Sequence, residues 1–338
     1  MTDVADLHLV PDRPAGSLPD RFPLGGLPAT VTVCEVGPRD GLQNESATVP
    51  TATKVEFVRR LEAAGLAVVE VTSMVRPSWV PQLGDAEQVL AALGPPPPGT
   101  RRPVLVPNER GLERALALGV REVAVFASAT ETFARRNLNR GLHESMAMIL
   151  PVVDRALAAG VRVRGYLSMC FGDPWEGRVP LAQVVTAGRQ LLDAGCHELS
   201  LGDTIGVATP GHVRALLAAL TGTGTDVARL PVHFHDTYGQ ALANTLTALQ
   251  CGVGVVDASA GGLGGCPYAG SATGNLATED LVWMLDGLGV RTGIDLDALA
   301  ATSAWMAGTL GRPSPSGVVR ALAAAGTPPG NRDGGLVR

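Results

Sequence analysis

Lysine is almost absent from the sequence. Of its 27 basic residues, counted as lysine plus arginine, only Lys54 is a lysine. Schiff-base chemistry, attachment of pyridoxal phosphate and a P-loop each require a lysine at a defined position. Lys54 lies in segment 51–61, whose pattern predicts a helix on the surface. The near absence of lysine therefore argues against all three chemistries.

Paired cysteines are absent as well. The chain has 5 cysteines, an odd number, and none of them forms a Cys-x-x-Cys motif. Both observations argue against a disulfide framework and favour a reducing compartment. Residues 1–28 contain neither the apolar core of a signal peptide nor an Arg-rich amphipathic pattern. We therefore expect a cytoplasmic protein.

The sequence also lacks a membrane-spanning run and an excess of positive charge. Residues 237–256 carry no charge, but polar side chains interrupt them, so they predict a buried helix and strand rather than a membrane span. The formal net charge of −5 argues against a nucleic-acid partner. With 46% hydrophobic and 17% charged residues, the composition is typical of a protein with a sizeable core.

What the sequence does contain is a regular alternation of short apolar runs and helical segments. The runs are rich in β-branched residues, most of them follow a glycine, and the segments between them have helical periodicity. Eight runs are predicted to be strands, at residues 31–35, 67–72, 103–106, 122–127, 161–168, 197–201, 231–235 and 254–259. Eight successive β-α units predict a single (β/α)8 TIM barrel of the α/β class.

A doubly wound open sheet is the alternative architecture. Its usual signature is missing, because Val36-Gly-Pro-Arg-Asp-Gly follows the first run where Gly-x-Gly-x-x-Gly is expected. We expect residues 29–326 to form the barrel domain, with extra C-terminal helices within 291–325. Residues 1–28 are predicted to be a flexible N-terminal extension and residues 327–338 a flexible tail.

Polar side chains gather where the predicted strands end, which is where barrel enzymes place their catalytic groups. They include Glu35, Arg39, Asp40, Glu70, Asn108, Glu131, Asp203, Thr204, His233, His235 and Asp257. His233 and His235 are two positions apart, so in a strand their imidazoles project from one face about 6–7 Å apart. Imidazole is the commonest side-chain metal ligand. A single His-x-His is more often coincidental, but the other polar residues at this end favour a metal site.

Six segments together carry a resemblance to a known family. They are Glu35-Val-Gly-Pro-Arg-Asp-Gly-Leu-Gln-Asn-Glu45, Glu70-Val-Thr-Ser, Trp79-Val-Pro-Gln, Leu201-Gly-Asp-Thr-Ile-Gly206, His233-Phe-His-Asp-Thr-Tyr-Gly-Gln-Ala-Leu-Ala-Asn244 and the glycine-rich segment 261–275. The combination resembles the signatures of 3-hydroxy-3-methylglutaryl-CoA lyases, in register from about residue 31 to about residue 325. Arg-Asp with His-x-His marks the wider DRE-TIM metallolyase superfamily, whereas Gly-Gly-Cys-Pro-Tyr points to the lyase branch.

The resemblance implies a divalent cation as cofactor. The residues that it implies as ligands are Asp40, His233, His235 and Asn275. Two nitrogen and two oxygen ligands that leave positions open suit Mg²⁺ or Mn²⁺ better than a closed tetrahedral zinc site. From the sequence alone, Asn275 is also a candidate N-cap for a helix that starts at the next residue.

The resemblance also implies a reaction. It is the cleavage of the C2–C3 bond of 3-hydroxy-3-methylglutaryl-CoA to acetyl-CoA and acetoacetate, a late step of leucine degradation. Arg39 is the candidate donor to the thioester oxygen, where negative charge develops. The alternative is that Arg39 only pairs with Glu70 or Asp40. Cys266 resembles the family's catalytic cysteine, which gives a proton to the enolate carbon or belongs to the shuttle that does so. The alternative is a reactive but idle surface thiol.

Three further residues complete the implied catalytic set. Glu70 is expected to hold the Arg39 side chain or to relay a proton. Asp203 is expected to orient a ligand histidine or the substrate hydroxyl. His233 is implied as a catalytic residue as well as a ligand. Asp257, by contrast, is predicted to be structural.

Recognition of the acyl-CoA substrate is less well marked. The candidates for it are Arg39, Arg76, Arg136 and Thr204. Arginine is favoured because its contacts with phosphate are strong. Met74 and Asp173 stand where relatives usually have phenylalanine and cysteine. The identity of the acyl group therefore stays open.

Two alternative functions stay open at this stage. One keeps the site and changes the substrate: a lyase or Claisen-type synthase of the same superfamily that acts on a related 3-hydroxyacyl-CoA. A synthase usually carries a regulatory domain beyond the barrel, for which we expect no room in this chain. The other is a barrel kept as a non-catalytic module, against which the intact set of candidate residues argues. A homodimer is expected for an enzyme of this kind.

Overall fold

The structure is a computed structural model that describes residues 19–265 and 274–325. The predicted flexible tail lies outside these ranges, as does most of the predicted N-terminal extension. In the part of the extension that is described, the Phe22 amide donates to the Gly287 carbonyl (2.8 Å) at the end of helix α9, Thr278–Gly287. No helix in the described ranges has the length and apolar content needed to cross a membrane.

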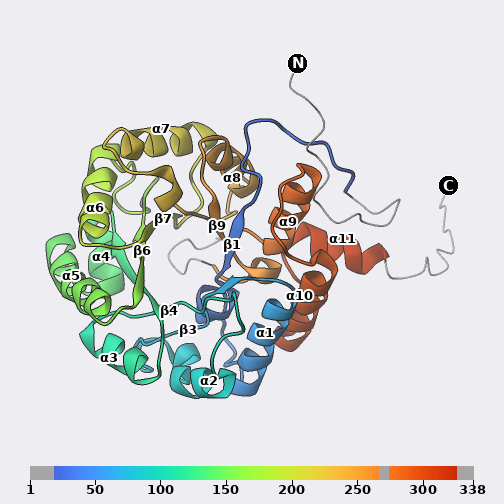
Figure 1. The fold of residues 1–338 in the computed structure, drawn as a ribbon, viewed down its shortest axis with the longest axis horizontal. Helices are drawn as coiled ribbons and strands as arrows, with labels where there is room; N and C mark the ends of the chain where they lie inside the picture. The colour runs from blue at the N-terminus through green and yellow to red at the C-terminus, as the bar shows by residue number, and fades with distance from the viewer. Residues whose placement is uncertain (1–18, 266–273, 326–338) are drawn as a thin grey trace, which may run out of the picture.

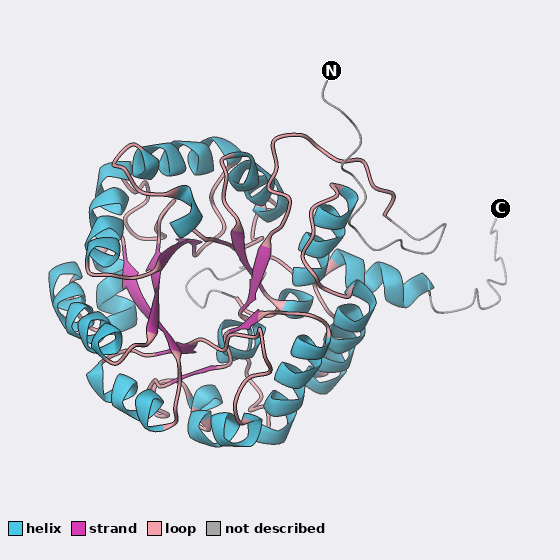
Figure 2. Cartoon of the chain, viewed as in Figure 1, coloured by secondary structure: helices cyan, strands magenta, loops and turns pink. Residues whose placement is uncertain are grey.

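The strands form one parallel sheet. In the described residues they are β1 Thr32–Glu35, β2 Val68–Val69, β3 Thr72–Ser73, β4 Val104–Leu105, β5 Glu122–Ser128, β6 Arg162–Ser168, β7 Glu198–Asp203, β8 Val232–Phe234 and β9 Val255–Ala258. Their order in the sheet is β2-β1-β9-β8-β7-β6-β5-β4-β3. Figure 1 and Figure 2 show these strands as a ring that the helices surround.

The sheet closes because β2 and β3 belong to one strand. Between them, the Glu70 amide donates to the Glu35 carbonyl on one side (2.8 Å), and the Val71 amide donates to the Pro103 carbonyl on the other (3.2 Å). β2 pairs with β1 and β3 pairs with β4. Counted as one strand, they reduce the sheet to eight parallel strands. The predicted (β/α)8 barrel is thereby confirmed.

Helices follow the strands and cover the outside of the ring. They are α1 Thr51–Ala63, α2 Ala86–Leu93, α3 Glu109–Ala117, α4 Glu131–Leu138, α5 Leu142–Ala158, α6 Leu181–Asp193, α7 Pro210–Thr221, α8 Ala241–Gln250, α9, α10 Leu296–Leu310 and α11 Gly317–Ala325. Helix α4 was not predicted; it is short, and Asn139 ends it in the left-handed conformation with φ 54°. Short polar segments of this kind give little periodic signal.

The extra C-terminal helices are present, as predicted. Helix α10 lies between α1 and α9 and contacts both, so it completes the outer ring (Figure 1). Its Trp305 ring lies 6.5 Å from the Phe57 ring of α1, and the Arg60 guanidinium of α1 lies 4.5 Å from the Trp305 ring. Apolar burial and a cation–π contact thus attach the C-terminal helices to the start of the barrel.

The surface position predicted for Lys54 was wrong. The helix is present, but Lys54 is only 4% exposed, and its ammonium group forms an ion pair with Asp85 (2.6 Å). Its partner precedes helix α2, which packs against α1. The burial comes from the packing of one helix on the next, which the helical pattern of a single segment does not reveal.

The interior of the barrel contains an ionic cluster. Barrel interiors are usually filled by branched apolar side chains. Here the buried Arg164 guanidinium donates to Glu198 (2.6 Å) and to Asp257. Arg162 also contacts Glu198 (3.2 Å). The sequence analysis did not predict this cluster, which we call the interior ionic cluster (Arg162, Arg164, Glu198 and Asp257).

Replacing the centre of this cluster is expected to destabilise the fold. Arg164→Met leaves two carboxylates of the barrel interior without their main partner, and breaking a buried ion pair in this way costs about 3–5 kcal/mol. We expect a fall of that size in the free energy of unfolding, measured by urea denaturation with circular dichroism. Arg155→Met is the control, since Arg155 makes its two ion pairs on the exposed surface of α5. Equal losses in the two variants would contradict the prediction.

Candidate metal centre and active site

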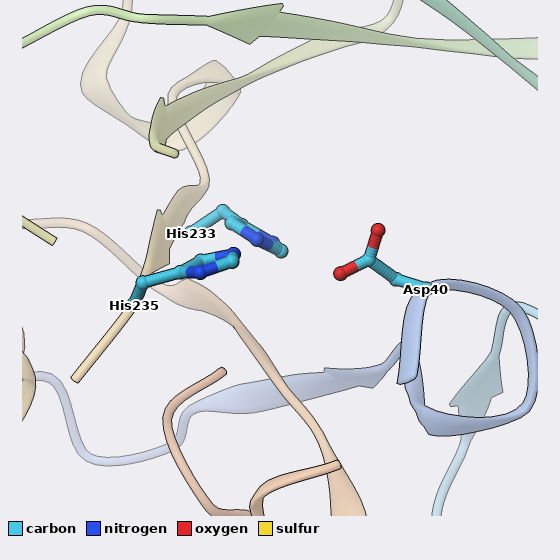
Figure 3. Close-up of side chains that lie close together, drawn as sticks. All are labelled: Asp40, His233 and His235. Carbon is cyan, nitrogen blue, oxygen red and sulfur yellow. The ribbon is translucent and has the colours of Figure 1, made fainter. Parts of the chain in front are cut away.

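Two histidines and an aspartate meet at the carboxyl end of the strands. One ligand atom each from Asp40, His233 and His235 lies within 4.8 Å of the others. His233 is on β8 and His235 directly follows it, and their ring centroids are 5.3 Å apart. Figure 3 shows the Asp40 carboxylate facing both imidazoles from a turn that follows β1. The spacing of two in a strand explains why both rings are on one face.

Asp40 is carried by a single π-helical turn, η2, at Gly37–Gly41. The Val36 carbonyl accepts from the amides of Asp40 (2.7 Å) and Gly41 (3.1 Å). A Cβ atom at Gly41 would lie 2.8 Å from the Ser259 hydroxyl oxygen, so only glycine fits this turn against the neighbouring loop. Isolated π turns often occur at functional sites.

Glu35 ties this turn to the opposite loop. Its carboxylate is fully buried and accepts from the amides of Gly37 (2.7 Å) and Ala260 (2.9 Å) and from the Thr278 hydroxyl (2.7 Å). Burial raises the pKa of Glu35 to about 7, although these hydrogen bonds oppose the rise. The sequence analysis noted Glu35 at a strand end but assigned it no role. The structure shows that it fixes the turn that carries Asp40.

The raised pKa of Glu35 predicts a pH dependence of stability. Its folded pKa of about 7 lies above the ordinary value of 4.5, so its contribution is complete below about pH 4.5 and is lost as pH rises through 7. Glu35→Gln is neutral throughout. We therefore expect the variant to gain about 2–3 kcal/mol of unfolding free energy relative to the wild type between about pH 5 and about pH 8. Urea denaturation across this range measures the difference; a gap between the two proteins that does not change with pH would contradict the assignment.

Arg39 lies between two carboxylates. Its guanidinium donates to Glu70 Oε2 from Nε (2.8 Å) and to Asp40 Oδ1 from Nη1 (2.7 Å). The Tyr166 hydroxyl donates to the same oxygen of Glu70 (3.2 Å). Burial lowers the pKa of Arg39, but the two carboxylates outweigh it, so the net pKa lies above the ordinary value. Glu70 holds Arg39 as expected, and the pairing that was considered as an alternative for Arg39 is present with both partners.

The charges around Asp40 keep it ionised. Burial raises the pKa of Asp40, but Arg39, followed by His233 and His235, outweighs burial and holds the pKa well below its ordinary value. Burial and the neighbouring His233 lower the pKa of His235 to about 4. A carboxylate beside a neutral imidazole is the protonation state in which both groups bind a cation.

Asn275 completes the cluster. Its amide nitrogen donates to Asp40 Oδ2 (2.8 Å) and to the Leu263 carbonyl (3.0 Å). Its Oδ1 is buried and has no hydrogen-bond partner among the described residues. The next helix starts at Thr278 with Ala277 as its N-cap, so the alternative of Asn275 as an N-cap was wrong.

The residues present fit a divalent cation. A buried polar oxygen without a partner is unfavourable, and a cation bound at Asn275 Oδ1 would satisfy it. With the carboxylate of Asp40 and the two imidazoles, the set offers two oxygens and two nitrogens. Such a mixed set with further positions open is typical of Mg²⁺ or Mn²⁺ sites.

A cavity of about 490 Å³ opens directly at this cluster. Its polar wall includes Arg39, Asp40, His233, His235, Ser200 and Thr204, and its apolar wall includes Val75, Val80, Leu105, Phe126, Phe133 and Leu138. Gly265, the last residue described before the gap, also lines it. The cavity is large enough for a small acyl group beside the cluster.

Several predicted residues lie elsewhere. Within the described residues, Asp203 does not line the cavity; it accepts from the amides of Val207 (2.9 Å) and Ala208 (3.0 Å) and so orders the loop after β7. Burial raises the pKa of Asp203 to about 6, although the hydrogen bonds from these amides lower it. Cys266 lies outside the described residues.

The arginines proposed for CoA are both exposed. Neither Arg76 nor Arg136 is among the described residues that line the cavity. The guanidinium of Arg136 lies 4.4 Å from the Trp175 ring. Thr204 does reach the cavity wall, where its hydroxyl oxygen accepts from the Met169 amide (2.9 Å).

The two departures from the family pattern do not reach the cavity. Neither Met74 nor Asp173 is among its described lining residues. Asp173 is buried and accepts from the Thr130 hydroxyl (2.6 Å) and the Trp175 amide (2.7 Å), so it fixes the loop after β6. Neither substitution therefore changes a described residue of the cavity wall.

Asp257, which was predicted from the sequence to have only a structural role, lies next to the metal-ligand candidates. Asp257 Oδ2 lies 3.4 Å from His233 Nδ1. The two residues are register partners on β8 and β9. Its position at a strand end was visible in the sequence, but the pairing of two strands decides which neighbour it meets.

Comparisons with known proteins agree with the geometry. The HMGL-like family model matches residues 30–306. The mitochondrial hydroxymethylglutaryl-CoA lyase of Rattus norvegicus is 50% identical over 298 residues, which cover 88% of this chain and 91% of the relative.

Two solved structures have the same fold. The hydroxymethylglutaryl-CoA lyase from Pseudomonas aeruginosa is 46% identical, has a TM-score of 0.86 and covers 89% of this chain and 99% of its own. An HMG-CoA lyase from Acenitobacter baumannii in complex with coenzyme A and 3-methylmalate is 33% identical, has a TM-score of 0.83 and covers 94% of this chain and 100% of its own. The resemblance seen in the motifs is confirmed, and the chain belongs to the HMGL-like family of carbon–carbon lyases.

Proposed function

We propose that this protein is a divalent-metal-dependent lyase that cleaves 3-hydroxy-3-methylglutaryl-CoA to acetyl-CoA and acetoacetate. One observation carries the proposal: Asp40, His233 and His235 meet beside Arg39 on the polar wall of the cavity. The relatives from Rattus norvegicus and Pseudomonas aeruginosa are hydroxymethylglutaryl-CoA lyases. A cytoplasmic location and a homodimer remain predictions.

Asp40, His233, His235 and Asn275 are the residues that hold the cation, which we propose to be Mg²⁺ or Mn²⁺. A cation held there supplies Lewis acidity, which lowers the pKa of a coordinated hydroxyl group. The chain contributes a neutral imidazole at His235 and an ionised carboxylate at Asp40. Both groups are thereby prepared for binding without a change of protonation at neutral pH.

Arg39 is the donor to the thioester oxygen. The C3 hydroxyl loses its proton and becomes the ketone of acetoacetate, while the electron pair of the C2–C3 bond moves to the acetyl-CoA enolate. Over the whole cycle, the released proton replaces the one that the enolate carbon takes up. A fixed guanidinium stabilises that charge as it develops. Glu70, which also accepts from the Tyr166 hydroxyl, holds the Arg39 side chain at the cavity wall, so little reorganisation is needed.

The enolate carbon must then gain a proton, and we propose Cys266 as its source. A thiol with an ordinary pKa is a usable acid near neutral pH. Support comes from the position of Gly265, which lines the cavity immediately before Cys266 in the chain. Asp203 orders the neighbouring loop, and Thr204 lines the wall as a substrate contact.

The CoA moiety is proposed to leave the cavity towards Arg76 and Arg136. Both side chains are exposed, so phosphate groups can reach them. A relative of this chain is described in complex with coenzyme A. The assignment of these two arginines rests on their charge and exposure.

The proposed function is tested by the release of acetoacetate from 3-hydroxy-3-methylglutaryl-CoA by the purified protein with Mg²⁺ or Mn²⁺. We expect metal-dependent turnover that collapses in Cys266→Ala. Mn²⁺ binding without turnover would indicate a related 3-hydroxyacyl-CoA, and longer and shorter 3-hydroxyacyl thioesters would then be assayed. Neither binding nor turnover would favour a non-catalytic barrel.

A further inference from the structure

The imidazole of His233 is contacted from inside the barrel by one carboxylate. Asp257 Oδ2 lies 3.4 Å from His233 Nδ1, and no other described residue offers that nitrogen a hydrogen bond. His233 and Asp257 are register partners on adjacent strands, so their side chains project from the same face of the sheet. The two ring nitrogens of an imidazole point in different directions. With Nδ1 directed at Asp257, Nε2 is the nitrogen left for a cation.

Asp257 is itself held from two other strands. Its Oδ2 accepts from the Ser200 hydroxyl on β7 (2.7 Å), and its Oδ1 is ion-paired with Arg164 on β6. The Asp257 side chain is fully buried, and Arg164 is almost fully buried. A carboxylate with this many partners cannot rotate freely, so it presents one fixed oxygen to the imidazole.

We propose that Asp257 is the positioning residue for the metal ligand His233, with Ser200 and Arg164 fixing Asp257. A carboxylate that accepts from the far nitrogen of a ligand histidine sets its tautomer and ring orientation and raises its basicity. This role replaces the one expected of Asp203, which orders the loop after β7 instead. The inference rests on the proposed metal site.

The alternative is that Asp257 is only the counter-ion of Arg164. Glu198 separates the two interpretations, because it also pairs with Arg164 (2.6 Å) and no contact between it and His233 is found. Glu198→Gln therefore disturbs the interior ionic cluster about as much as Asp257→Asn does, but it leaves the Asp257 carboxylate facing His233. It is the matched control for Asp257→Asn.

The experiment is a titration of each purified full-length protein with Mn²⁺, followed by electron paramagnetic resonance of the free ion. Disruption of such a supporting carboxylate usually weakens metal binding about 10–100-fold. We expect an increase of that size in the Kd of Asp257→Asn, a smaller increase of about 3–10-fold for Ser200→Ala, and a Kd within about two-fold of wild type for Glu198→Gln.

Each outcome is decisive. Unchanged Mn²⁺ affinity in Asp257→Asn, or an equal loss in Glu198→Gln, overturns the positioning role. If circular dichroism shows that Asp257→Asn is unfolded, the Mn²⁺ affinity of Ser200→Ala becomes the test. Wild-type affinity in Ser200→Ala then overturns the proposal. Absence of Mn²⁺ binding by the wild-type protein would instead reject the proposed metal site, so the two failures are distinguishable.

Discussion

Arg39→Met is expected to lower kcat for cleavage of 3-hydroxy-3-methylglutaryl-CoA by about 100–1000-fold. Removal of a single fixed donor to a developing oxyanion has an effect of this size. The side chain is buried at the cavity wall and is held by Glu70 and Asp40 at 2.8 and 2.7 Å, so it is a donor with a fixed position. The measurement is steady-state release of acetoacetate at saturating Mn²⁺.

Saturating metal is needed because Arg39 also donates to Asp40, a proposed ligand. Mn²⁺ binding measured on the same variant separates a lost donor from a lost cation. Arg155→Met, which removes an exposed arginine of α5, is the control and should retain wild-type kcat. A fall in kcat of less than about tenfold with metal bound would show that Arg39 only pairs with its neighbours.

Metal removal is expected to have a larger effect. Treatment with EDTA should lower turnover by roughly 1000-fold or more, because a Lewis acid supplies several kcal/mol of transition-state stabilisation. His235→Ala should give the same loss at low Mn²⁺ and recover part of the activity as Mn²⁺ is raised. Acetoacetate release across a Mn²⁺ titration measures both.

A matched histidine variant controls for this experiment. His143 lies on the exposed side of α5, so His143→Ala should bind Mn²⁺ and turn over as the wild-type protein does. Full turnover by protein shown to be metal-free by elemental analysis would reject the metal-dependent mechanism. Loss of activity in His143→Ala would point to a general effect on folding.

Local patterns predicted the barrel and one part of the site. The eight apolar runs are rich in β-branched residues and most of them follow a glycine. This information is local to each run, so the strands were found within a few residues. His233 and His235 were grouped because a strand has a period of two. Arg39 and Asp40 were recognised through the resemblance, and the π turn that presents them came only from the structure.

Other features depended on how distant segments meet. The division of the second strand into β2 and β3 follows from its two different neighbours, β1 and β4. The burial of Lys54 follows from the packing of α1 on α2. Asn275 was a possible helix cap until the structure placed the helix start at Thr278 and its side chain beside Asp40.

By itself, the sequence determined the fold class, the family and the end of the barrel where the site lies, because these depend on periodicity and on residue types in order. Only the tertiary structure decided that Asp257 faces His233, that Asp203 orders a loop and that Glu35 fixes the turn of Asp40. Those contacts are set by strand register and by the closing of the sheet, and they bring together residues that are far apart along the chain.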